Sequence, residues 1–234
     1  MEDSGIARIW GVLVSPTSTF RAIATKPSWV VPLLLLMGIG LAGAVLLTDK
    51  MDWDEITRES ILASGRDVPE DQLEGIVEFQ EKAGPIFMIG GSVVLQPVIF
   101  LLLALVFLVT FKVLGGELNF VSSFSVILHG LMPRAVMGLL SIPVILGKSE
   151  FGYEELRDNS VLTSNLASFA PDDAGPALIG VLSSIDVFSL WALGLLIVGY
   201  ATVAKVSKAS AGAGVIGLWI VYVLGKVGLA SLGG

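Results

Sequence analysis

The sequence has no cysteine and only one histidine among its 234 residues. The lack of cysteine excludes disulfide bonds and thiolate-ligated zinc or iron–sulfur sites, and one histidine is too few for a multi-histidine metal site. Charged residues are also scarce, at 15% of the chain against about 25% in soluble proteins. The balance is acidic, with 14 Lys and Arg against 21 Asp and Glu, which argues against nucleic acid as a partner. We therefore expect no metal and no cofactor.

Apolar sequence is abundant instead, because 54% of the residues are hydrophobic and the mean hydropathy is +0.84. Several runs reach the roughly 18–20 residues needed to cross a bilayer. They lack the alternation of barrel strands, and helices are the other structure that satisfies every backbone polar group in lipid. The sequence therefore predicts an all-α, polytopic membrane protein, a single domain over residues 1–234. We expect five transmembrane helices, at about 28–47, 85–113, 123–146, 177–204 and 213–232.

Prolines interrupt two of these spans. The second span would be roughly 43 Å long as a straight helix, which exceeds the hydrocarbon core of about 30 Å and predicts tilt or a kink near Pro97. The third span contains Pro133 and Pro143, so we expect it to be bent or broken.

The charges between the spans predict the orientation. The short segment between the last two spans holds Lys205 and Lys208 with no acidic residue, which favours the cytoplasmic side. The acidic segments 48–84 and 147–176 then become outer loops, the first of which is expected to be helical. Five spans place the two termini on opposite sides. We therefore expect a multi-pass protein of the cell membrane with a cytoplasmic N-terminus and an outer C-terminus.

Residues 1–27 are predicted to form interfacial helices on the cytoplasmic side. Ser15 and Pro16 supply a cap and a first helical residue for the second of them. Trp10, Phe20 and Trp29 are candidate anchors at the membrane interface. Such a segment can serve as a plain anchor packed on the bundle or as a recruitment surface. The first helix is indicated by apolar residues at helical spacing, namely Ile6, Ile9, Trp10, Leu13 and Val14.

Four residues within the spans form a candidate polar cluster. A charge in the membrane is costly and is a functional candidate by default. Arg134 lies near mid-depth of the third span, and Asp186 is equally deep if the fourth span begins at Pro176. The two would then form an ion pair, acting as a structural clasp or as a substrate-contacting or proton-linked site. A fourth span that begins at Ile185 instead would leave Asp186 at the interface and unpaired with Arg134.

The other two polar residues are Lys226 and His129. Lys226 lies near the outer end of the fifth span, where it can extend outward or compete for Asp186. His129 lies one helical turn before Pro133, either as a hydrogen-bonded packing residue or as a titrating group.

Three groups of residues occur in a recognisable order along the chain. They are Trp10, Ser15-Pro16, Phe20 and Pro27; Leu114-Gly115-Gly116, Phe120, Phe124 and Pro133; and Asp186-Val187-Phe188-Ser189-Leu190-Trp191 with Gly199. Together they resemble the Yip (Ypt-interacting protein) domain family in its prokaryotic form. The resemblance implies five spans, a cytosolic N-terminus and a role without catalysis. Eukaryotic members associate with Rab-type GTPases and shape or traffic membranes. This chain lacks their long cytosolic N-terminal region and has a large acidic outer loop, so Rab binding is not carried over.

Two functions follow from these observations. The first is a non-enzymatic, membrane-organising or protein-interaction role, with the lipid bilayer and a membrane-protein partner or a second copy as partners. The alternative is a small transporter, channel or lipid-translocating protein that uses the Arg134 and Asp186 cluster. An enzyme is not expected, because the sequence contains neither HExxH nor GxSxG and its one histidine has no triad partner at a recognisable spacing.

Overall fold

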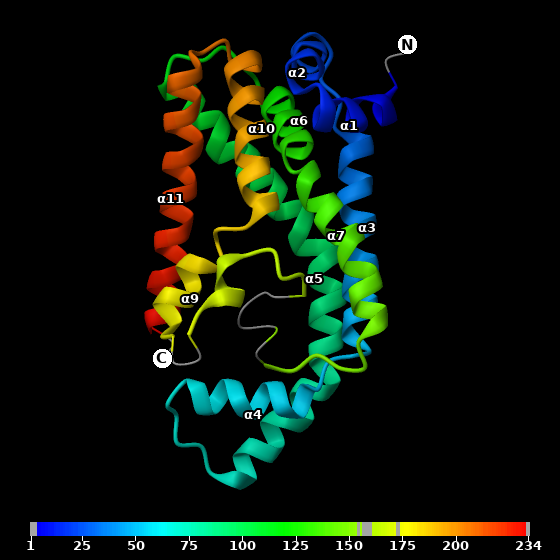
Figure 1. Ribbon diagram of the computed structural model, residues 1–234, viewed down its shortest axis with the longest axis vertical. Coiled ribbons are helices and arrows are strands. Elements are labelled where there is room, and N and C mark those ends of the chain that lie inside the picture. Colours follow the sequence, from blue (N-terminus) through cyan, green and yellow to red (C-terminus); the bar gives the residue numbers. More distant parts are fainter. Residues whose placement is uncertain (1–3, 154, 156–160, 172–173, 233–234) are drawn as a thin grey trace. The chain divides into compact units, whose positions relative to one another are not determined.

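The computed structural model describes residues 4–153, 155, 161–171 and 174–232. These residues are mostly helical (Figure 1), so the all-α prediction is confirmed. Their β-structure is limited to two isolated bridges, between Met51 and Phe151 and between Asn165 and Asp186. The helices are α1 (Gly5–Val14), α2 (Pro16–Thr25), α3 (Val30–Thr48), α4 (Trp53–Ala63), α5 (Glu70–Val113), α6 (Phe120–Gly130), α7 (Met132–Gly147), the 3-10 helix η1 (Leu166–Phe169), α9 (Pro176–Leu182), α10 (Val187–Val203) and α11 (Lys208–Leu232).

The chain divides into two compact units. Unit 1 comprises Met1–Ile39, Val94–Met137 and Phe188–Val221. Unit 2 comprises Gly40–Val93, Gly138–Val187 and Tyr222–Gly234.

In the described part of the chain, four helical segments are long and apolar enough to cross a membrane. These segments confirm the multi-pass character of the protein. The remaining apolar helix of the expected five, α10, has 17 residues, which is the lower limit for a span. The four segments are Val30–Thr48, Glu70–Val113, Phe120–Gly147 and Lys208–Leu229.

The fourth expected span differs most from the structure, because it is split between α9 and α10. The hydroxyl groups of Ser183 and Ser184 both donate to the carbonyl oxygen of Gly180, at 3.4 and 2.7 Å, and end α9. Serine side chains compete for helix carbonyls in this way. The backbone that follows pairs with the preceding loop, where the Val187 N–H donates to the Ser164 carbonyl at 3.3 Å. The apolar composition of residues 177–204 conceals this break.

Two other spans also depart from their expected form. Helix α5 begins at Glu70 rather than near residue 85, so part of the expected outer loop continues the span as one 44-residue helix. Acidic Glu70 and Asp71 in its first turn suit the positive end of the helix dipole. The third expected span is broken at Leu131, between α6 and α7, two residues before Pro133. Helix α7 continues through Pro143, and α5 continues through Pro97.

Unit 1 is built around an apolar core to which α1, α2, α5, α6, α10 and α11 contribute. The ring of Tyr200 stacks against the rings of both Phe107 and Phe111, with centroids 5.1 and 4.2 Å away. The buried Ser123 hydroxyl lies 2.8 Å from the Tyr200 hydroxyl and 2.7 Å from the Ala104 carbonyl oxygen. Aromatic packing with internally paired hydroxyls thus joins α5, α6 and α10.

Unit 2 has fewer buried apolar side chains than unit 1, and polar and backbone contacts also join its segments. Arg58 of α4 contacts Asp54 at 2.7 Å and Glu70, at the start of α5, at 3.0 Å. The buried Phe151 exchanges backbone hydrogen bonds with residues on either side of Met51. These contacts connect segments that are far apart in the sequence.

Candidate functional site

The four polar residues predicted within the spans fall into both units. Arg134 and His129 lie in unit 1, and Asp186 and Lys226 lie in unit 2. The Arg134 side chain is exposed near the beginning of α7, whereas Asp186 is only 7% exposed. Helix α10 begins at Val187, so Asp186 precedes the helix rather than lying within it. The Arg134–Asp186 ion pair joins residues of different units and stays a prediction.

His129 is fully buried in the core of unit 1. Its Nδ1 atom lies 2.8 Å from the carbonyl oxygen of Ser125, one turn earlier in α6. Its Nε2 atom has no hydrogen-bond partner among the described residues. This environment suits the packing role better than that of a group in contact with water.

Asp186 and Lys226 each contact serine side chains near α9, in the loop before this helix and at its end. The Ser164 hydroxyl donates to a carboxylate oxygen of Asp186 at 2.5 Å. The Lys226 ammonium donates to the hydroxyls of Ser183 at 2.6 Å and Ser184 at 3.5 Å. Lys226 therefore fastens α11 to the end of α9, a role that its position in the sequence did not reveal.

Helices α1 and α2 form a platform, residues 5–25, which packs on α6 in unit 1 (Figure 1). The Arg8 side chain is only 5% exposed, and its guanidinium donates to the Lys26 carbonyl at 2.5 Å and to the Ser28 hydroxyl at 2.9 Å. A Cβ atom at Gly11 would lie 2.6 Å from the Thr19 hydroxyl, so the two helices approach closely there. The platform is thus fixed to the chain that leads into α3.

The opposite face of α1 carries an exposed apolar row. Ile6, Trp10 and Val14 are 74%, 68% and 58% exposed. A spacing of four residues places them on one side of the helix. Of the other two predicted anchors, Trp29 is 39% exposed, with its ring 5.8 Å from that of Phe124, and Phe20 is fully buried. Phe20 therefore lies in the core rather than at an interface. The sequence did not reveal this, because helical spacing alone did not show which face of α2 meets α6.

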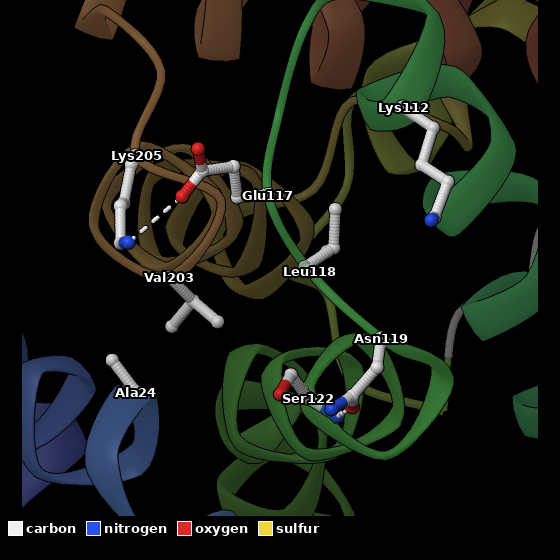
Figure 2. Close-up of a pocket in the computed structure, with 8 residues that line it drawn as sticks. All are labelled: Ala24, Lys112, Glu117, Leu118, Asn119, Ser122, Val203 and Lys205. Atoms are coloured by element: carbon white, nitrogen blue, oxygen red, sulfur yellow. Dashed lines mark hydrogen bonds and ion pairs between the residues drawn. The ribbon is translucent and has the colours of Figure 1, made fainter.

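A hollow of about 450 Å³ lies in unit 1 where α5 and α10 end and α6 begins (Figure 2). We call it the α6 hollow. It was not found from the sequence, because its residues come from four separate segments. They are Ala24, Lys112, Glu117, Leu118, Asn119, Ser122, Val203 and Lys205.

The Gly115-Gly116 turn connects two of the segments that line this hollow, the end of α5 and the residues before α6. Gly115 has φ +82°, a left-handed conformation that favours glycine. A Cβ atom at Gly116 would lie 2.8 Å from the Phe111 carbonyl oxygen and 3.0 Å from the Ala204 side chain. The turn lets the Glu117 N–H donate to the Ala204 carbonyl at 3.0 Å, which joins the segment before α6 to the end of α10. The glycine pair noted in the sequence thus has a structural reason.

Charged groups line the hollow. The Lys205 ammonium lies 2.8 Å from a Glu117 carboxylate oxygen, and both side chains are more than two-thirds exposed (Figure 2). This hydrogen bond lowers the pKa of Glu117 and raises the pKa of Lys205. Lys112, on the adjoining end of α5, has no ion-pair partner among the described residues. The arrangement gives two cations and one carboxylate around a single hollow.

Ser122 is the buried polar residue of the hollow, at 8% exposed. Its backbone N–H donates to the Asn119 side chain at 2.9 Å, which caps α6. Its hydroxyl has no hydrogen-bond partner in the part of the chain that the structure describes. The residue is more than nine-tenths buried, yet its hydroxyl oxygen remains accessible from the hollow, where a ligand can contact it.

Comparison with known proteins agrees with the resemblance seen in the sequence. The chain is 26% identical over 200 residues to "Membrane protein YknW" of Bacillus subtilis (strain 168), an alignment that covers 86% of this chain and 80% of the Bacillus protein. No solved structure matches. The Yip1 domain matches residues 10–229, nearly the whole sequence, and the chain therefore belongs to the Yip1 domain family.

Proposed function

We propose that this protein is a non-enzymatic, five-span membrane protein of the cell membrane that organises the bilayer around it through its α1–α2 platform. In this proposal α10 also crosses the membrane, as the fourth of five spans in chain order, because 17 residues at 1.5 Å each reach about 25 Å. The N-terminus is cytoplasmic and the C-terminus lies outside. Lys205 and Lys208, between α10 and α11, support this orientation.

The observation that carries the proposal is the division of α1 into two faces. Arg8 and Val12 are buried against the rest of unit 1, while Ile6, Trp10 and Val14 are exposed. An amphipathic helix of this kind lies in the membrane interface with its apolar face about 5–10 Å deep, at the boundary between headgroups and acyl chains. Because the platform is fastened to α3 and α6, the inserted row would displace lipid in one leaflet beside the spans.

The insertion is tested with single-cysteine probes, which are clean here because the natural chain has no cysteine. The full chain is reconstituted in vesicles with Ile6→Cys or Val14→Cys carrying a fluorescent label. We expect nitroxide-labelled lipid to quench both probes. Arg21→Cys, at an exposed position of α2, is the matched control and should be quenched by iodide in the water instead. Equal iodide quenching at all three positions would contradict the insertion.

The effect on the bilayer is tested by the vesicle diameter measured with cryo-electron microscopy. We expect wild-type protein to change the diameter distribution, and the double variant Ile6→Gln, Val14→Gln to lose this effect while keeping its melting temperature.

Cross-linking in the same vesicles tests for a membrane-protein partner or a second copy. A strong cross-link through Trp10 without any change in vesicle diameter would contradict the membrane-organising role and support a protein-interaction role instead.

Paired ion-flux and lipid-scrambling assays separate this proposal from transport. In the proposed role, wild-type vesicles show neither activity, and Arg134→Ala lowers the melting temperature because Arg134 and Asp186 act as a clasp. Flux or scrambling that Arg134→Ala abolishes at an unchanged melting temperature would make the protein a transporter instead.

A further inference from the structure

We infer that the α6 hollow is a binding site for a phosphate-bearing anion, held by Lys112, Lys205 and the Ser122 hydroxyl. The inference rests on the proposed function only in placing this end of unit 1 at the cytoplasmic boundary of the membrane. The phosphate can belong to an anionic lipid headgroup or to a soluble phosphate compound.

The Ser122 hydroxyl is the first observation that points to a ligand. The Ser122 side chain is mostly buried, but its hydroxyl oxygen is still reached by solvent and has no hydrogen-bond partner among the described residues. Ser122 is 8% exposed and lines the hollow, and Asn119 already accepts its backbone N–H. The hydroxyl is therefore left to donate to a group that enters the hollow (Figure 2).

The second observation is the pair of lysines from different parts of the fold. Lys112 ends α5, and Lys205 follows α10 with φ +57°, a backbone conformation that few residues other than glycine adopt. Two ammonium groups and a hydroxyl supply the donors that a phosphate accepts.

Glu117 is the competing group in the hollow. Its ion pair with Lys205, 2.8 Å long, is largely exposed to solvent, and such pairs contribute little free energy. A phosphate can therefore displace the carboxylate from Lys205. The hollow, of about 450 Å³, has room for a phosphate group together with the glycerol of a lipid headgroup. Anionic headgroups lie at the depth where spans end, and basic groups there attract them.

The site is tested with the purified full chain in detergent by isothermal titration calorimetry. The three probes are dioctanoyl phosphatidylglycerol, dioctanoyl phosphatidylcholine and inorganic phosphate. We expect Lys112→Gln to weaken phosphatidylglycerol binding about fivefold, which is the effect of one cation near an anionic surface. Ser122→Ala should weaken it by about the same factor, because it removes one hydrogen-bond donor to the phosphate. Glu117→Gln should strengthen it by a similar factor. Lys208→Gln is the matched control, because Lys208 begins α11 outside the residues that line the hollow.

The probes also separate the two sources of phosphate. Tighter binding of phosphatidylglycerol than of inorganic phosphate, with dependence on Lys112 and Ser122, supports a lipid site. The reverse order with the same dependence supports a site for a soluble phosphate. Equal affinity for phosphatidylcholine overturns the inference, as does a Lys208→Gln effect equal to that of Lys112→Gln. Melting temperatures of all variants identify any loss that comes from unfolding.

This result is distinguishable from a failure of the proposed function. If the probes at Ile6 and Val14 stay accessible to iodide while phosphatidylglycerol binding keeps its dependence on Lys112, membrane organisation by α1 is wrong and the anion site stands. If the probes insert but the lysine and serine variants bind as wild type does, the anion site is wrong and the proposed function stands.

Discussion

Unit 1 and unit 2 are built from the same chain in different ways. Unit 1 contains seven Lys and Arg against three Asp and Glu, whereas unit 2 contains seven against eighteen. The apolar core cluster lies wholly in unit 1. Unit 2 has a smaller set of buried apolar side chains, Phe151 among them, together with ion pairs such as Arg58 with Asp54 and the backbone bridge at Met51 and Phe151. The comparison separates a part with one large apolar core from a part with less apolar burial and more charge.

The difference also bears on orientation. Acidic residues contribute little to topology, so the surplus of Asp and Glu in unit 2 does not by itself place that unit outside. It does mean that the segments of unit 2 outside the spans can remain solvated, since a face rich in carboxylates is well hydrated. The basic groups at one end of unit 1, around Lys112 and Lys205, are the ones suited to an anionic leaflet.

The largest expected effect concerns the apolar core, the feature that most clearly distinguishes unit 1 from unit 2. Phe20→Ala removes a fully buried ring from the core of unit 1 and should lower the free energy of unfolding by about 3–5 kcal/mol. The matched change in unit 2 is Phe169→Ala, at a ring that is 77% exposed, and should alter it by about 0.5 kcal/mol or less. Denaturant unfolding in detergent micelles measures both. Similar losses for the two variants would show that the core of unit 1 is not the main source of stability.

A smaller effect tests how closely α10 packs against its neighbours in unit 1. A Cβ atom at Gly199 would lie 2.8 Å from Val126 and 2.9 Å from the ring of Phe20. Overpacking of about 1–3 kcal/mol should therefore exceed the gain of about 1 kcal/mol in helix propensity, and Gly199→Ala should destabilise the protein. At Gly194, in the same helix, nothing lies within 4 Å of the added atom, so Gly194→Ala should be neutral or stabilising. Thermal melting of the two variants should therefore shift in opposite directions.

The sequence was most informative where apolar runs are long. The spans that contain α3, α5 and α11 follow from hydropathy, because lipid requires continuous apolar helix there. The expected span 177–204 missed the break before α10, and only the alternative start at Ile185 came close to the observed start at Val187. Ser183 and Ser184 act through hydrogen bonds to one carbonyl group, which hydropathy does not register. The buried side of α2 was also missed, because Phe20 meets α6 only in the folded unit.

Candidate site residues were harder to predict than spans. Charges were sought within the apolar runs, where Arg134 and Asp186 stood out, and their pairing stays a prediction. The α6 hollow instead collects residues from α2, α5, the segment before α6 and the end of α10. Proximity of this kind depends on tertiary structure. The signal that could have suggested it was the Gly115-Gly116 pair, since adjacent glycines after a basic helix end mark a tight turn.

The smallest expected effect concerns an ion pair of unit 2 and depends on pH. Lys148 donates to Glu155 at 2.6 Å, and this hydrogen bond lowers the pKa of Glu155 from its ordinary value of 4.5. A lowered carboxylate pKa stabilises the folded state above the ordinary value, and the contribution is lost as the pH falls through the lowered pKa. Because the Lys148 side chain is 44% exposed, Glu155→Gln should lower the melting temperature by about 2 °C or less at pH 7.

That difference should shrink as the pH falls, because wild-type Glu155 then becomes neutral like the glutamine. Glu59→Gln is the matched control in the same unit, since Glu59 is exposed and has no ion-pair partner among the described residues. Its melting temperature should track that of wild type as the pH falls from 7 to below the lowered pKa of Glu155. A Glu155→Gln difference that stays constant over this range would mean that Glu155 acts through packing rather than charge. Unit 2 would then resemble unit 1 more closely than its composition suggests.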